Sequence, residues 1–217
     1  VVSTKHRSIH TYVIGQSGTG KSRALESWIM QDILAGQGVG VIDPHGELYQ
    51  NLLYRVASRP ETWDRIILID PLDPKWVVGF NPLLSSGSYH PERLALYLTD
   101  VAIKVWHIKT SNAPRLVWLL TNSFLALADL GLSLLDLPRF LADNSYRDNL
   151  LPKLKHKTTR NYFKYEFPTS EGAVNQWVSP VLNKIGGLIF DQDIRLMFFG
   201  ENTINFRELM DDQKILL

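Results

Sequence analysis

A glycine-rich octapeptide, Gly15 to Ser22, constrains the folding of this chain more than any other part of its sequence. It reads G-Q-S-G-T-G-K-S and fits the phosphate-binding pattern G-x-x-x-x-G-K-[ST] at every position. An apolar stretch, Tyr12 to Ile14, precedes it as a strand would, and the helix-like run Ser22 to Leu34 follows it. The alternative interpretation, a glycine turn without a ligand, leaves Lys21 and Ser22 unexplained.

The residue types in this octapeptide predict how it binds a nucleotide. Backbone N–H groups of such a loop can surround a phosphate, and the helix N-terminus adds positive potential. Lys21 is expected to reach the β- and γ-phosphates of ATP, and the Ser22 hydroxyl to ligate Mg²⁺. Arg23 either lies against the nucleotide or is an exposed residue of the first turn. The predicted nucleotide-binding residues are Gly15, Gln16, Ser17, Gly18, Thr19, Gly20, Lys21, Ser22 and Arg23.

Composition excludes some functions and leaves others open. With 217 residues, 45% of them hydrophobic, the chain can form a substantial core. The net charge of +1 neither requires nor excludes nucleic acid. The absence of cysteine excludes disulfides, thiolate metal sites and a cysteine nucleophile.

The most apolar stretch, Leu116 to Leu137, is interrupted by Asn122, Asp129 and Asp136, so we expect buried helices rather than a membrane span. The expected location is cytoplasmic. Because the sequence does not begin with Met, a membrane anchor upstream of residue 1, holding the protein at the inner face of the cell membrane, stays open as an alternative.

Three segments with different patterns indicate the domain organisation. Residues 1–88 alternate apolar runs of four with helical patterns, which is typical of an α/β core with a parallel sheet. Residues 89–200 show only helical patterns and predict an all-helical insertion, and residues 201–217 predict a return to the core. The expected core strands are Thr11–Ile14, Val39–Ile42, Ile66–Ile69 and Lys214–Leu217. The sequence ends inside the last of these strands, which predicts that it is a fragment.

At this point the sequence resembles a known family. Val41-Ile42-Asp43-Pro44-His45-Gly46-Glu47 is similar to the second signature of the HerA/FtsK-type P-loop ATPases. Gly79-Phe80-Asn81-Pro82-Leu83 resembles a later block of the branch that contains conjugative type IV secretion coupling proteins of the TraD/TraG type. The helical insertion resembles the all-α domain of those proteins.

The resemblance implies a RecA-like core, a hexameric ring, and ATP hydrolysis that translocates DNA. It also implies a secretion-channel partner, or a nuclease partner if the chain is nearer to HerA. The acidic pair that ends a strand in this family is absent, so we expect it after Leu217 or, alternatively, a protein without a catalytic base. A second function class therefore stays open, in which the chain is a nucleotide-gated assembly or protein-recruiting module of a secretion machine.

Besides Lys21, the candidate catalytic residues are Asp43 and Glu47. Asp43 ends an expected strand, where it could position water or metal, or it could simply start a turn with Pro44. Glu47 could share that role or favour a helix N-terminus. Arg195 is a candidate for the arginine that acts on a neighbouring subunit's nucleotide, with a surface ion pair to Asp191 as the alternative.

One basic segment interleaves cationic and aromatic residues: Lys153, Lys155, His156, Lys157, Arg160, Tyr162, Phe163, Lys164 and Tyr165. Such a segment can bind a DNA strand through phosphates and stacking. The alternative is a solvated helix face whose aromatic side chains pack inward.

Overall fold

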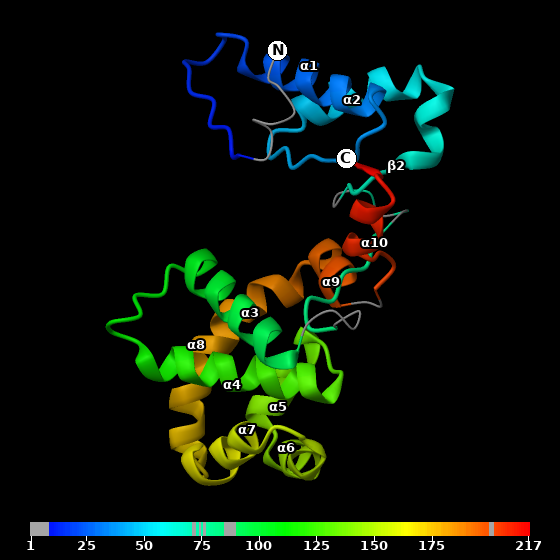
Figure 1. Ribbon diagram of the computed structural model, residues 1–217. Coiled ribbons are helices and arrows are strands. Elements are labelled where there is room, and N and C mark those ends of the chain that lie inside the picture. The colour runs from blue at the N-terminus through cyan, green and yellow to red at the C-terminus, as the bar shows by residue number, and fades with distance from the viewer. Residues whose placement is uncertain (1–8, 71–72, 74, 76, 85–89, 200–201) are drawn as a thin grey trace. The chain divides into compact units, whose positions relative to one another are not determined.

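The computed structural model describes residues 9–70, 73, 75, 77–84, 90–199 and 202–217 (Figure 1). The chain divides into two compact units, the first combining Val1–Ile69 with Phe206–Leu217 and the second being Asp70–Asn205. The domain boundaries expected at 88/89 and 200/201 fall outside the described residues.

Helices and one small sheet form the first unit. Its helices are α1 (Lys21–Leu34), α2 (Glu47–Ala57), the 3-10 helix η2 (Pro60–Arg65) and α10 (Phe206–Asp211). Apolar side chains that recur at helical spacing on α1 and α2 face the strand residues of the sheet. The resulting core consists of Met30, Ile33, Leu52, Val56, Ile215 and Leu217.

The sheet takes its central strand from the far end of the chain. Its strands are β1 (Val39–Gly40), β2 (Ile66–Ile67) and β3 (Ile215–Leu216), all parallel and in the order β1-β3-β2. Ile215 is in register with both Val39 and Ile66. The amide of Val41 donates to the Leu216 carbonyl at 2.9 Å, and that of Ile69 to the Leu217 carbonyl at 2.7 Å.

The expected RecA-like α/β core with a mostly parallel sheet is wrong. Among the described residues the structure is 63% helical, and its sheet has three short strands. No described strand pairs with Thr11–Ile14, where Tyr12 is 87% and Ile14 80% exposed, and Ile42 beyond β1 is 96% exposed. An apolar run forms a strand only where a neighbour accepts its backbone hydrogen bonds. Three of the expected runs pair in this way and form strands of two residues, whereas Thr11–Ile14 has no such neighbour among the described residues.

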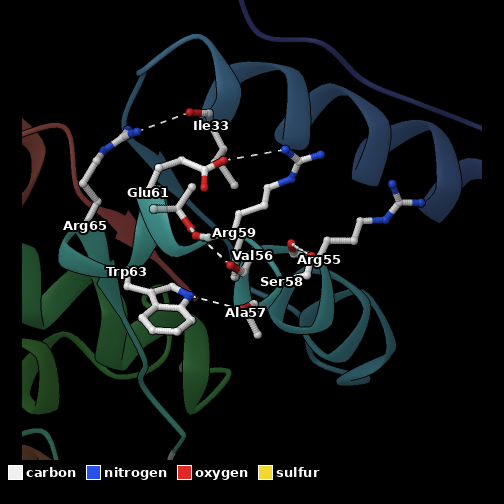
Figure 2. A network of polar contacts seen from close by, with 10 residues as sticks. Ile33, Arg55, Val56, Ala57, Ser58, Arg59, Glu61, Trp63 and Arg65 are labelled. Atoms are coloured by element: carbon white, nitrogen blue, oxygen red, sulfur yellow. Dashed lines mark hydrogen bonds and ion pairs between the residues drawn. The ribbon is translucent and has the colours of Figure 1, made fainter.

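The Arg65 side chain ties the first unit together at the end of η2. Its guanidinium donates to the carbonyl oxygens of Ile33 (3.2 Å), Gln37 and Gln213 (2.9 and 3.1 Å). Figure 2 shows the Ile33 bond, which also places a cation at the C-terminal end of α1. Arg65 therefore fixes the end of α1, the approach to β1 and the approach to β3 relative to one another.

Side chains of η2 hold it against the end of α2 (Figure 2). The Thr62 hydroxyl lies 3.2 Å from the Val56 carbonyl oxygen and 2.8 Å from that of Arg59. The Trp63 indole donates to the Ala57 carbonyl at 3.2 Å. The bonds to Val56 and Ala57 reach carbonyl groups in the last turn of α2, which have no partner inside the helix, and the bond to Arg59 lies just beyond that helix.

Every regular element in the described part of the second unit is helical (Figure 1). The central helix, α4 (Pro114–Leu130), carries an unbroken buried run from Asn122 to Leu127. It begins with proline and ends at Gly131, whose φ of 68° forms the left-handed cap that glycine favours. The other helical elements are α3 (Pro91–Val105), η3 (Leu134–Asp136), α5 (Leu137–Ala142), α6 (Asn144–Leu150), η4 (Leu151–Lys153), α7 (Lys157–Asn161), the π-helix η5 (Tyr162–Glu166), α8 (Glu171–Phe190) and α9 (Gln192–Phe199).

The first and last segments of the second unit meet each other. The Phe80 amide donates to the Met197 carbonyl at 2.6 Å, and the Thr203 amide to the Gly79 carbonyl at 3.0 Å. Hydrogen bonds therefore join the segment that enters the second unit to the segment that leaves it. None of the described helices has both the length and the apolarity that crossing a bilayer requires.

We predict that Arg65→Met loosens the sheet of the first unit. Losing charge-assisted bonds to three carbonyls should cost about 2 kcal/mol, which corresponds to roughly thirtyfold faster local opening. Hydrogen exchange of the Val41, Ile69 and Leu217 amides measures this. Arg59→Met is the matched control, because the Arg59 side chain contacts only Glu61, at 3.8 Å, within the described residues. Equal protection in both variants would contradict the role of Arg65.

Candidate phosphate-binding site

The octapeptide forms a glycine turn that leads directly into α1. Gly18 and Gly20 have φ angles of 80° and 87°, in the left-handed region that other residues avoid. Gly20 is the N-cap of α1, and no side chain caps the helix there. The N–H groups of the first turn therefore have no partner within the helix and no other acceptor in the described part of the chain, so an anion can bind to them.

Gly15 is required by a close approach inside the turn. A Cβ atom at this position would lie 2.7 Å from the Thr19 Oγ1 atom. That hydroxyl donates to the Gln16 carbonyl at 2.8 Å and so closes the turn. At Gly18 and Gly20 an added Cβ would meet no atom of the described residues within 4 Å, so these residues leave the space beside both glycines open.

The Lys21 ammonium folds back over the loop. Its Nζ atom lies 2.7 Å from the Gly15 carbonyl oxygen and 2.6 Å from that of Gln16. These two carbonyls hold a cation at the mouth of the turn. A phosphate group arriving there would compete with the carbonyl oxygens for the ammonium, and a charged acceptor forms the stronger bond.

The other predicted binding residues surround the same turn. Gln16, Ser17, Ser22 and Arg23 are exposed. The described residues contain no group of three or more His, Cys, Asp or Glu side chains that could hold a metal. A magnesium ion at this site would therefore depend on the Ser22 hydroxyl, on phosphate oxygens and on water, which is a set of oxygen ligands that Mg²⁺ accepts.

Asp43 uses its carboxylate to start α2. One oxygen accepts from the His45 amide at 3.1 Å, and the other from the Tyr49 amide at 3.0 Å. Burial alone would raise the pKa of the Asp43 carboxyl, but the hydrogen bonds from backbone amides, led by Tyr49, lower it below its ordinary value. These contacts favour the turn interpretation of Asp43 over a catalytic one.

Glu47 is exposed in the first turn of α2, where a carboxylate interacts favourably with the helix dipole. Within the described residues no hydrogen bond or ion pair joins Asp43 or Glu47 to the glycine turn. The structure thus brings the nine predicted binding residues together at the start of α1, while the predicted catalytic roles of Asp43 and Glu47 stay predictions.

Sequence reasoning missed a buried carboxylate on α1. Glu26 is buried and pairs with Arg55 of α2, so it joins the two helices. Its spacing of four and seven residues from Met30 and Ile33 places it on the buried face of α1. That spacing is the signal in the sequence that could have identified it.

The remaining candidates lie in the second unit. Tyr162 and Phe163 are buried, as the inward-packing alternative for the basic segment requires, whereas Tyr165 is exposed. Arg195 is exposed on α9, and no ion pair to Asp191 forms in the described part of the chain. The Asp191 carboxylate instead accepts the amides of Asp193 and Ile194, both at 3.1 Å, at the start of that helix.

Comparison of the sequence and structure with models of known protein families, with curated proteins and with solved structures gave no match.

Proposed function

We propose that the chain binds Mg·ATP at the Gly15–Ser22 turn and acts in an ATP-driven motor that translocates DNA. The observation that carries the nucleotide part is the geometry of the turn. Two left-handed glycines, an uncapped helix N-terminus and the Lys21 ammonium converge on one open site. This combination supplies backbone donors and one positive charge to a phosphate chain.

In the proposed mechanism the chain's own groups bind and orient the triphosphate. The backbone amides of Gly18, Gly20, Lys21 and Ser22 hold the phosphate oxygens, and Lys21 exchanges the Gly15 and Gln16 carbonyls for phosphate oxygens. The Ser22 hydroxyl would contribute one magnesium ligand. When bound, the metal ion neutralises charge that develops on the transferred phosphoryl group.

The DNA part of the proposal is supported by the resemblance of Asp43–Glu47 and Gly79–Leu83 to the coupling-protein branch. One observation favours a second candidate, the nucleotide-gated assembly module. The Asp43 carboxylate is already bonded to two backbone amides, so it is poorly placed to activate a water molecule. A protein of this kind would bind ATP to hold an assembly together without rapid hydrolysis.

We predict that Lys21→Ala weakens ATP binding about thirtyfold or more, because the variant loses a charge-assisted contact to phosphate. Titration with a fluorescent ATP analogue in the presence of Mg²⁺ measures the dissociation constant. Lys109→Ala removes an exposed lysine of the second unit and is the matched control. An unchanged affinity in Lys21→Ala would show that the nucleotide does not bind at this turn.

We also predict that DNA stimulates ATP hydrolysis by the protein and that this stimulation falls steeply as salt rises, because DNA binding releases counterions. Phosphate release measured with and without DNA at several salt concentrations tests this, with Lys21→Ala as the inactive reference. A hydrolysis rate indifferent to DNA at low salt would favour the assembly module instead.

A further inference from the structure

A cavity in the second unit combines buried aromatic walls with clustered positive charge. Its volume is about 650 Å³, which is in the range of small-molecule sites. It lies where α6 and η4 face α7, η5 and the residues that follow. The residues that line it are Asn144, Arg147, Asp148, Leu151, Pro152, Arg160, Phe163, Lys164, Phe167, Pro168 and Thr169.

The charges around this cavity are unbalanced. Three cationic residues, Arg147, Arg160 and Lys164, line it together with one carboxylate, Asp148. The Asp143 carboxylate also acts on the Arg147 charge, and the Lys164 ammonium lies over the exposed Tyr165 ring at 5.1 Å. None of the three cations forms an ion pair within the described residues. Arg160 and Lys164 lie four residues apart where α7 continues into η5, so both can face the same hollow.

Arg147 is a buried cation with unused donors. It is 4% exposed, and its guanidinium lies over the Phe167 ring at 4.5 Å. Its Nη1 atom donates to the carbonyl oxygens of Phe140 (3.2 Å) and Leu141 (2.9 Å), and its Nη2 atom donates to the Asn144 side chain. The Nε atom is buried and has no hydrogen-bond partner among the described residues.

A purely structural role accounts for only part of this arrangement. The Nη1 bonds cap the end of α5, where a cation is favourable. They do not account for the unpartnered Nε donor, because leaving a buried donor unpaired costs free energy. They also leave unexplained why Arg160 and Lys164 line the same cavity.

We propose that this cavity binds a small ring-bearing phosphomonoester, of which a free 5′-mononucleotide is the representative. A phosphomonoester carries close to two negative charges at neutral pH, which is opposite in sign to the excess of cationic side chains that line the cavity. The apolar wall of Leu151, Pro152 and Pro168 would contact the remainder of the molecule. The inference is independent of the phosphate loop of the first unit.

The test is calorimetric titration of AMP into the Lys21→Ala protein, in which the glycine turn is disabled. We expect one saturable site, weakened about tenfold by Arg160→Gln and about tenfold by Lys164→Gln, since each variant loses a charge-assisted contact. Neither side chain donates a hydrogen bond to another described residue, so both variants should fold. Lys157→Gln removes an equal charge from an exposed α7 residue outside the cavity and should change nothing.

Four results would overturn the proposal. The first is the absence of saturable AMP binding, and the second is an equal loss of affinity in Lys157→Gln, which would indicate general surface charge. The third is binding of adenosine as tightly as AMP. A tetranucleotide that displaces AMP as well as AMP itself would overturn the assignment to a free small molecule. ATP binding at Lys21 is measured in a separate experiment. A negative result for one site therefore leaves the proposal for the other site unaffected.

Discussion

The pairing of Ile215–Leu216 with both Val39–Gly40 and Ile66–Ile67 is the constraint on which the first unit depends. The two outer strands have no bond to each other, so the sheet exists only when the end of the chain lies between them. Arg65 reinforces this arrangement, because its guanidinium bonds carbonyls next to α1, β1 and β3 at once. The second unit separates β2 from β3 in the sequence. Hydrogen bonds hold its first and last segments together, at Gly79, Phe80, Met197 and Thr203.

Helices were predictable where local signals are strong. Helix α4 (Pro114–Leu130) is an example, because the proline at its start and the glycine that follows its end act locally. Helix α8 shows the opposite case, because it continues through Gly186 and Gly187, which favour a helix end, to Phe190. Leu188 and Ile189 of this last turn pack against the core. The free energy gained by burying them outweighs the conformational entropy that two glycines lose in a helix.

The sheet was harder to predict for a physical reason. An apolar run such as Thr11–Ile14 has strand propensity, but pairing depends on distant residues that no local pattern reveals. In the candidate site, the glycine turn and Lys21 follow from a contiguous motif. The Glu26–Arg55 pair and the buried Arg147 guanidinium do not, because their environments are assembled by packing between helices.

The central claim is that the Gly15–Ser22 turn is a site for the phosphates of ATP, and hydrogen exchange tests it most directly. The amides of Gly18, Gly20, Lys21 and Ser22 should gain protection when Mg·ATP is added, because phosphate oxygens become their acceptors. Amides of the central helix α4 should show no change. Unaltered exchange at the turn under saturating Mg·ATP would contradict the account.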